Sequence, residues 1–262
     1  MFEKIRGYFF GFNKYKDLLR ELVIRDIKVR YRKSFLGILW TVLNPLMMMA
    51  VLTVVFSTIF RSNIENFPVY YLTGSLLFSF NSEATTQAQT AIIGNASLIK
   101  KVYIPKYLFP LSRVMSSLVN LCFSFIALLI VMVVTKSTFH PTMIFAVYPI
   151  ICLMMFTTGL SLVLSVYTVF FRDLVHLYGV FTLIWMYLTP LFYPLEMLPP
   201  EAKSIVEMNP LYHFIVYFRL VILDGHIPTL MQHINLFLIG FMFLIIGIVV
   251  FIRRQDKFIL YI

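Results

Sequence analysis

The sequence predicts an all-α integral membrane protein with six transmembrane helices. Of its 262 residues, 60% are hydrophobic and only 13% are charged, and the mean hydropathy is +0.86. A soluble domain carries about 25% charged residues, and a globule of this size cannot bury so much apolar surface by itself. A bilayer must therefore cover the remainder. We expect residues 1–262 to form a single transmembrane domain, with residues 1–33 at the cytoplasmic surface and residues 34–262 in the membrane.

The segment ahead of the first apolar run is predicted to be an amphipathic interfacial helix. It holds ten of the 22 basic residues. Glu21 with Arg25 and Asp26 with Arg30 read as acid-before-base pairs four residues apart. Its apolar residues recur at helical spacing, at Leu18, Leu22, Val23 and Ile27. Such a helix is too charged to insert and should lie along the membrane. It could serve as an anchor or as a docking surface for a partner.

Six stretches are apolar enough and long enough to cross a membrane, which takes about 20 residues. They are Phe35–Phe60, Phe67–Ile93, Val114–Thr135, Thr142–Phe171, Leu174–Tyr193 and Met231–Ile252. An even number of spans puts both termini on one side. With that side in the cytoplasm, only Arg61, Lys136, Lys203 and Arg219 of the 22 basic residues fall outside, as the positive-inside rule requires.

The segment between the fifth and sixth stretches is predicted to contain re-entrant helices on the outer side. The apolar piece Leu211–Leu223 is too short to span and is interrupted by Arg219. Six of the chain's 12 prolines punctuate this region: Pro190, Pro194, Pro199, Pro200, Pro210 and Pro228. Broken helices are tolerated at membrane depth only where protein or a water-filled cavity covers the backbone. The pattern therefore favours a protein with a path through it.

No motif for covalent chemistry occurs in the chain. There is no Gly-x-x-x-x-Gly-Lys-Ser/Thr loop for a nucleotide, no zinc-protease motif and no serine-hydrolase motif. The five histidines are scattered, without the spacing of a metal site. We predict no catalytic residue, metal or cofactor bound by this chain. The net charge of +10 lies mostly ahead of the first span, which indicates a membrane surface and not nucleic acid.

The second stretch is unusually polar for a membrane helix. It carries Glu83 and Gln87, and Ser79, Glu83, Thr86 and Thr90 share one helical face. An ionisable residue in a span is costly and is a functional candidate by default. The preferred interpretation is that Glu83 pairs with a neighbouring helix or reaches the cytoplasmic edge. The alternative is that it couples transport to protons.

Aromatic and hydroxyl groups form a stripe along the fifth stretch, at Tyr178, Thr182, Trp185, Thr189 and Phe192. Aromatic faces can stack on sugars while hydroxyls exchange hydrogen bonds along them, so the stripe could line a sugar path. It could equally pack helices together or mark the membrane interface. In the first stretch, Trp40 and Asn44 share a face just before Pro45 and could serve a gate or simple packing.

Five segments of the sequence form a recognisable series. They are Arg30-Tyr31-Arg32-Lys33-Ser34-Phe35-Leu36-Gly37-Ile38-Leu39-Trp40 with Leu43-Asn44-Pro45, Asn95 to Lys106, Phe171-Arg172-Asp173-Leu174, Thr189-Pro190-Leu191-Phe192-Tyr193-Pro194, and Asn209-Pro210-Leu211. Together they resemble the membrane subunits of type-2 ABC exporters for polysaccharides and polyol phosphates. They occur in the family's order along nearly the whole chain. The resemblance implies a homodimer in a bacterial inner (plasma) membrane, bound to two separate ATP-binding cassette subunits that use ATP and Mg.

The resemblance also implies roles for residues. The amphipathic helix and the short helix between spans two and three would contact the ATPases, and the turn at Arg172 and Asp173 would be a second contact. The short helix supplies Leu98, Ile99, Lys100, Lys101 and Tyr103. The family's first and fifth spans line the path, which supports the same role here for Trp40, Asn44, Tyr178, Trp185 and Phe192.

The function predicted on this basis is export of a lipid-linked polysaccharide, such as O-antigen, capsule or a teichoic-acid-like polymer, powered by the partner ATPases. Two rivals stay open. An ABC exporter of a small molecule or drug would share the topology, and an ion-coupled secondary transporter would use Glu83 as its coupling carboxylate. An intramembrane enzyme would need a catalytic pair, and the sequence offers none.

Overall fold

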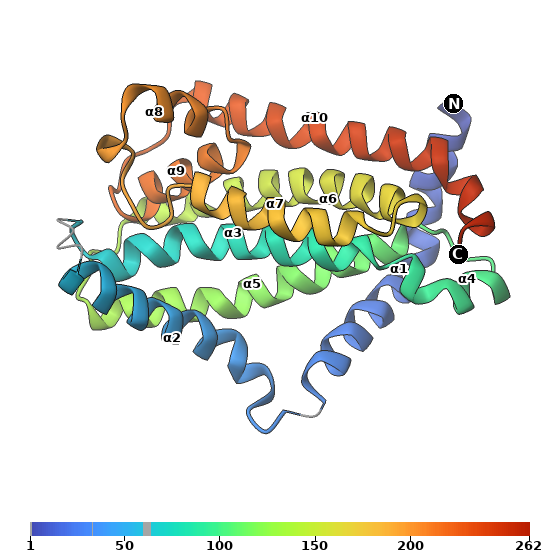
Figure 1. The fold of residues 1–262 in the computed structure, drawn as a ribbon, viewed down its shortest axis with the longest axis horizontal. Helices are drawn as coiled ribbons and strands as arrows, with labels where there is room; N and C mark the ends of the chain where they lie inside the picture. The colour runs from blue at the N-terminus through green and yellow to red at the C-terminus, as the bar shows by residue number, and fades with distance from the viewer. Residues whose placement is uncertain (1, 33, 60–63) are drawn as a thin grey trace.

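The computed structural model describes residues 2–32, 34–59 and 64–262, and all regular secondary structure in these ranges is helical. The long helices of the bundle lie along the long axis of the molecule (Figure 1). α3 contacts α5, α6 and α7, and α6 also contacts α5 and α10. Their bounds are Phe67–Gln89 for α3, Leu108–Val134 for α5, Val147–Phe170 for α6, Leu174–Leu188 for α7 and Leu230–Arg254 for α10.

The first two helices form a V beside this bundle (Figure 1). α1 covers Phe2–Tyr31 and α2 covers Trp40–Val54, extended by a 3₁₀ turn before it and a π turn after it. The V turns at Gly37, whose φ of +51° is a backbone conformation that only glycine adopts readily. Among the long helices, α2 has its main contacts with α3 and α5, and Thr41 is the only residue of Trp40–Val54 that is buried.

Four of the six predicted spans are confirmed as apolar helices of membrane-crossing length. They are Gly37–Ser57, Leu108–Val134, Pro141–Phe170 and Leu230–Leu260. α3 has 23 residues, which is long enough, but its polar side chains keep it out of this apolar class. Three residues named in the predictions lie outside the described residues. They are Lys33 at the end of the interfacial segment, Phe60 at the end of the first predicted span, and Arg61 directly after it.

The helix of the fifth predicted span is shorter than the stretch Leu174–Tyr193. α7 has 15 residues and ends at Leu188. The cause is Pro190, because the residue before a proline is pushed out of the helical region. Thr189 accordingly has extended backbone angles, with φ −97° and ψ 129°. At about 1.5 Å per residue α7 rises only about 22 Å, and the loop after it must cover the remaining depth.

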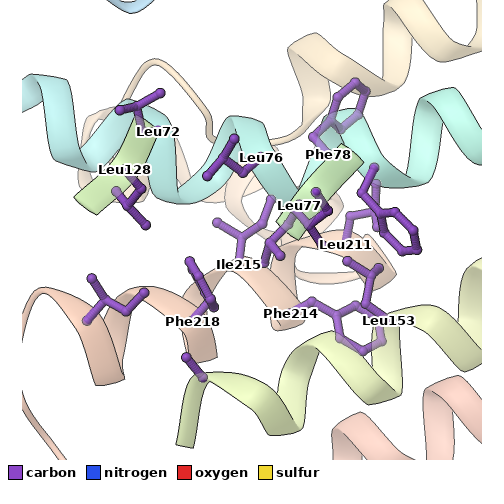
Figure 2. Close-up of a cluster of buried hydrophobic side chains, with 14 of the residues drawn as sticks. Leu72, Leu76, Leu77, Phe78, Leu128, Leu153, Leu211, Phe214, Ile215 and Phe218 are labelled. Atoms are coloured by element: carbon purple, nitrogen blue, oxygen red, sulfur yellow. The ribbon is translucent and has the colours of Figure 1, made fainter. Parts of the chain in front are cut away.

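The short helices before α10 are bent and partly buried. α8 (Pro200–Glu207) and α9 (Pro210–Ile222) meet at an angle of 91°. α9 packs between α3, α6, α10 and the 3₁₀ turn ahead of α6. In Figure 2 its apolar side chains meet those of the surrounding helices; the labelled residues are Leu211, Phe214, Ile215 and Phe218 of α9 with Leu72, Leu76, Leu77, Phe78, Leu128 and Leu153. This is the main hydrophobic core.

The two ends of the bundle differ in what they carry. Both chain termini, the six-residue helix α4 (Ala96–Lys101) and the connection between α6 and α7 lie at one end, whereas α8 and α9 lie at the other (Figure 1). A second apolar cluster fills the end with the termini. It consists of Leu19, Leu22, Ala91, Ile92, Ile99, Leu108, Phe109, Leu162, Val166, Val169, Phe251 and Phe258.

The predicted apolar face of the N-terminal helix therefore packs on protein. Leu19 and Leu22 of α1 are buried in the second apolar cluster, together with Ile99 of α4. The periodicity of the sequence predicts this face, with a membrane anchor or a docking surface for a partner as its two possible roles. The structure gives it the ends of α5, α6 and α10 instead, which makes α1 part of the bundle's end.

α6 and α10 approach each other more closely than any side chain would permit. A Cβ added to Gly159 would overlap the backbone of Phe243 and Leu244, and one added to Gly247 would overlap Gly159. A Cβ on Gly240 would lie 2.5 Å from the carbonyl oxygen of Cys152. Small residues at such an interface let backbones pack directly in a membrane. This contact ties the last helix firmly to the bundle.

Candidate functional site

The predicted coupling segment divides into a buried anchor and an exposed tip. Ile99 is buried in the second apolar cluster and Leu98 packs against it, so these two side chains hold α4 in place. Lys100 and Lys101 are exposed, and Tyr103 just beyond the helix is 93% exposed. An aromatic ring held in solvent beside two cations is an available contact for another protein.

The second predicted contact lies at the same end of the molecule. Arg172 and Asp173 are both exposed in the turn between α6 and α7. Phe171 next to them is 70% exposed. The short helix and this turn, two of the three segments that the family resemblance implies as ATPase contacts, therefore lie at the same end of the molecule, the one with both termini (Figure 1). These residues are far apart in the chain, and only the alternation of spans brings them to one end.

Polar side chains on both sides of α4, Asn95 before it and Lys106 after it, fix the position of the coupling segment. Asn95, directly before α4, donates from Nδ2 to the carbonyl of Ala91 at 2.7 Å, and its Oδ1 accepts from Nη1 of Arg25 at 3.2 Å. After α4, Lys106 Nζ donates to the carbonyl of Gln255 at 2.7 Å and lies 5.6 Å from the ring centre of Phe258. Burial lowers the pKa of Lys106, with Asp256 opposing the shift. α4 is thus joined to α1 and to the C-terminal segment.

Glu83 is held by donors from three helices. Its Oε1 accepts from Arg30 of α1 and from Gln87 of α3 at 2.9 Å. It also accepts from Ser117 at 3.2 Å and Asn120 at 2.8 Å, both on α5. Burial alone would lower the pKa of Arg30, but the charge of Glu83 and its hydrogen bond outweigh this, so the pKa is raised. The carboxylate is therefore the centre of an interhelical polar cluster.

A second ionic cluster, which sequence reasoning missed, surrounds Asp26. Its side chain is only 4% exposed and pairs with Arg25 at 3.0 Å and with Arg113 of α5 at 3.2 Å. Ser112 donates to its second oxygen at 3.3 Å. The predicted pairing of Asp26 with Arg30 is wrong, because Asp26 pairs with Arg25 and Arg113, whereas Arg30 pairs with Glu83 of α3. The signal available in the sequence was the polar run Arg113, Ser116, Ser117 and Asn120 at the start of a predicted span.

The predicted stripe on α7 turns toward the subunit's own interior. The Tyr178 hydroxyl donates to Oγ1 of Thr85 on α3 at 2.8 Å. Trp185 Nε1 donates to Oδ1 of Asn209 at 2.7 Å, and the Nδ2 of Asn209 donates to Thr189 at 2.9 Å. Tyr178, Trp185 and Thr189 are all buried. Their polar atoms tie α7 to α3 and to the loop before α9, which is the helix-packing alternative.

The other predicted path residues lie in different surroundings. Thr182 is half-buried and donates to the carbonyl of Tyr178 at 2.8 Å. Phe192 is half-buried and stacks on Tyr71, with ring centres 5.8 Å apart. Trp40 and Asn44 are exposed on α2. Of the seven predicted path residues, these last two lie on an uncovered helix face.

The end that carries α8 and α9 contains a buried cation, Arg219, which the sequence predicts to lie in a short re-entrant helix. Arg219 of α9 donates to the carbonyls of Pro190 at 2.9 Å and Tyr70 at 3.1 Å, and its guanidinium lies 3.6 Å from the centre of the Tyr70 ring. It joins α9 to α3 and to the turn after α7. Its charge is balanced by carbonyl dipoles and an aromatic face.

The described residues also show which sites for metal binding and for polar contacts the chain offers. Within residues 2–32, 34–59 and 64–262, no three histidine, cysteine or acidic side chains come together as a metal site would need. The exposed face of α3, in contrast, is polar: Ser79, Thr86 and Thr90 are uncovered, and Glu83 beside them is half-buried. A lipid-facing helix does not carry such a stripe, since polar groups within a span turn toward protein or water.

Comparison with known proteins gives one family. Residues 17–223 match the model of the ABC-2 type transporter family. The chain is 31% identical over 249 residues to the O-antigen export system permease protein RfbA of Myxococcus xanthus, covering 94% of this chain and 95% of that protein. It is 29% identical to a Klebsiella pneumoniae protein of the same name, with 96% and 95% covered. It is 22% identical to the polysialic acid transport protein KpsM of Escherichia coli, with 94% and 96% covered. With most of its length matched by the family model, and with the helices and uncovered polar face described above, this chain belongs to the ABC-2 type transporter family.

Proposed function

We propose that this chain is the membrane subunit of an ATP-driven exporter that moves a lipid-linked polysaccharide from the cytoplasm across the bacterial inner membrane. The cargo would be an O-antigen, a capsule polymer or a teichoic-acid-like polymer. The relatives named for O-antigen export and polysialic acid transport support this class of cargo, because each is matched over nearly its whole length. The chain itself would catalyse no reaction.

The observation that carries the proposal is the uncovered polar stripe on α3. Ser79, Thr86 and Thr90 are exposed on a helix that contacts both α2 and α7. Glycan hydroxyls can exchange hydrogen bonds with such groups, whereas lipid tails cannot. Trp40 and Asn44 on the uncovered face of α2 would add an aromatic and an amide to the same path. Tyr178, Trp185 and Thr189 would support the path wall from behind.

The proposed working form is a homodimer. α2 and α7 each leave an apolar face uncovered, and a second copy would cover part of it; exposed residues on these faces are Met47, Val51 and Val54 of α2 and Val180, Ile184 and Tyr187 of α7. α3 and α7 would complete six spans with the four apolar helices, both termini would lie in the cytoplasm, and α8 with α9 would form the re-entrant segment on the outer side. The whole chain would act as one membrane domain.

Energy would come from two ATP-binding cassette subunits that bind ATP and Mg on their own chains. We propose that they dock at the end that carries Lys100, Lys101, Tyr103, Arg172 and Asp173. Ile99 and Leu98 would transmit their movement into the second apolar cluster, in which α1, α5, α6 and α10 meet. ATP-driven closure of the two ATPases would thereby reach every long helix that ends there.

Co-purification with a candidate ATP-binding cassette subunit tests the proposal. Tyr103→Asp is expected to weaken binding about tenfold or more, since exposed aromatic anchors carry much of an interface's affinity. Phe139→Asp is the matched control, because Phe139 is a 55% exposed aromatic in the connection between α5 and α6, which lies at the opposite end of the bundle (Figure 1). Neither change should lower the melting temperature. Equal binding by both variants would contradict the docking site, and export without any ATPase would contradict the proposed function.

The ion-coupled alternative predicts that export requires an ion gradient and not ATP. A coupling carboxylate must gain and release a proton or ion in each cycle, but Glu83 is paired with the guanidinium of Arg30 and accepts three further hydrogen bonds. We therefore expect export in vesicles to continue when an ionophore collapses the ion gradients and to stop when ATP is withheld. The reverse pattern would favour Glu83 as a coupling group.

A further inference from the structure

Two ionic contacts hold α1 against the bundle, and they differ in the exposure of the acidic side chain, which is 4% for Asp26 and 32% for Glu83. Asp26 is buried with a 4% exposed side chain, and Arg113 and Ser112 of α5 contact it. Four residues on, Arg30 pairs with Glu83 of α3, and these side chains are 29% and 32% exposed. Breaking the buried contact would strand a charge away from water, which is costly. Parting the exposed pair costs little, because water can solvate both groups.

Glu83 has other hydrogen-bond donors besides Arg30. Its Oε1 accepts from Gln87, Ser117 and Asn120, all of which belong to α3 and α5. These donors stay with the carboxylate if α1 moves. The loss of Arg30 would therefore leave Glu83 hydrogen-bonded, whereas a pair with a purely structural role needs no such second set.

The position of the exposed pair links it to α2. Arg30 precedes Tyr31, the last residue of α1, and α2 follows the turn at Gly37. At this end α2 is joined to α5 by the hydrogen bond from Ser124 to the carbonyl of Thr41, at 3.0 Å. A swing of the last turn of α1 would therefore carry the start of α2 with it, including Trp40.

We propose that the Arg30–Glu83 ion pair is a latch. Asp26 and Arg113 act as the fixed point of α1, the latch holds the α1–α2 junction in the position seen here, and it parts when the uncovered face of α2 moves to open the path. This inference rests on the proposed export function. Arg30 and Glu83 are positioning residues, which act through the placement of α2.

The first test measures leakage without nucleotide. The complete complex with its ATPases is reconstituted into vesicles that hold a small fluorescent dye. Glu83→Gln and Arg30→Gln are each expected to raise dye leakage by about fivefold, the population shift that loss of a partly exposed ion pair allows. The double variant should leak no more than either single one. Arg32→Gln, which removes a neighbouring exposed charge, is the matched control and should leave leakage unchanged.

The second test prevents the pair from parting. In a background with Cys122 and Cys152 replaced, Arg30→Cys and Glu83→Cys are joined by a cleavable bifunctional thiol reagent of about the length of the ion pair. The latch predicts that ATP-driven export stops after cross-linking and returns when a reductant cleaves the reagent. A contact that stays closed throughout the cycle would give uninterrupted export.

The outcomes separate the two proposals. Unchanged leakage in the single variants, or export that continues after cross-linking, would overturn the latch. Export by the wild-type complex would still support the proposed function in that case. A wild-type complex that hydrolyses ATP and exports no glycan would overturn the proposed function. The leakage measurement needs neither ATP nor glycan, and it would decide the latch in that case as well.

Discussion

The chain's two tryptophans occupy opposite environments. Trp185 is 9% exposed, and its indole N–H donates to Asn209, which also accepts the backbone N–H of Leu211 at 3.0 Å. Trp40 is 41% exposed on α2. One indole therefore joins α7 to the start of α9 within the subunit, and the other is available to a second subunit or to cargo.

Substitution of each tryptophan should separate stability from export. Trp185→Phe removes the indole donor and leaves a void beside Asn209, so we expect the free energy of unfolding to fall by about 2 kcal/mol. Trp40→Phe should change it by less than about 0.5 kcal/mol, as at other exposed positions. Thermal denaturation in detergent measures both values. A large loss in Trp40→Phe with none in Trp185→Phe would contradict the assigned environments.

At the scale of single residues, the local sequence pattern predicted which residues are buried better than it predicted which residues form pairs. The preferred interpretation of Glu83, a pair with a neighbouring helix, is confirmed. The i to i+4 pairing of Asp26 with Arg30 is wrong, because such a pair stabilises a helix by only about 0.5 kcal/mol. Tertiary contacts outweigh it. Arg30 finds a partner 53 residues away in the sequence, and a single sequence contains no signal for that distance.

The close contact between α6 and α10 makes a prediction at the scale of elements. Gly159→Ala would place a methyl group against the backbone of Phe243, so the helices must separate, at a cost of about 2 kcal/mol or more in stability. Gly179→Ala on α7 is the matched control, because nothing lies within 4 Å of its added Cβ. Alanine also favours the helix over glycine there, so stability should stay equal or rise by up to about 1 kcal/mol.

Comparison of melting temperatures of the two glycine variants provides the measurement. An equal gain in both would mean that helix propensity, not the approach of α6 to α10, governs these positions. Export by the Gly159→Ala protein below its melting temperature would further report whether this contact must stay rigid during the cycle.

The elements themselves were largely predictable from hydropathy. Four of the six predicted spans are confirmed, since about 20 apolar residues in a row leave little choice of structure. The short helix α7 shows the limit of that rule. Hydropathy runs on to Tyr193, but the helix ends at Leu188 because Pro190 acts on the backbone and leaves hydropathy unchanged. The direction of the α7 stripe also depended on which neighbours α7 would have.

At the scale of the whole molecule, the two ends of the bundle should face opposite sides of the membrane. In a background with Cys122 and Cys152 replaced, Phe139→Cys is expected to react with a membrane-impermeant maleimide in spheroplasts. Tyr103→Cys should react only after the inner membrane is permeabilised. Both side chains are exposed, so accessibility to the reagent depends on the side of the membrane. Labelling of both from outside would contradict the predicted orientation.

The arrangement of the candidate site came from topology more than from motifs. The docking segments around Tyr103 and Arg172 share one end because spans alternate in direction, which the charge distribution already indicated. The exposed residues within those segments could not be read from the sequence. Leu98 and Ile99 resemble contact residues in the pattern, yet they anchor α4 and leave Tyr103 as the protruding group.

The burial of α9 constrains the order in which the polypeptide assembles during synthesis. This helix is surrounded by α3, α6, α10 and the turn ahead of α6, and it carries Arg219, whose charge would cost about 2.5–3.5 kcal/mol in lipid. The helix has no stable place in the bilayer until those neighbours exist. α10 leaves the ribosome after α9, so we expect α9 to settle only once the last span has been inserted. The last α-helix to reach its final position is therefore α9, although α10 is the last α-helix to be synthesised.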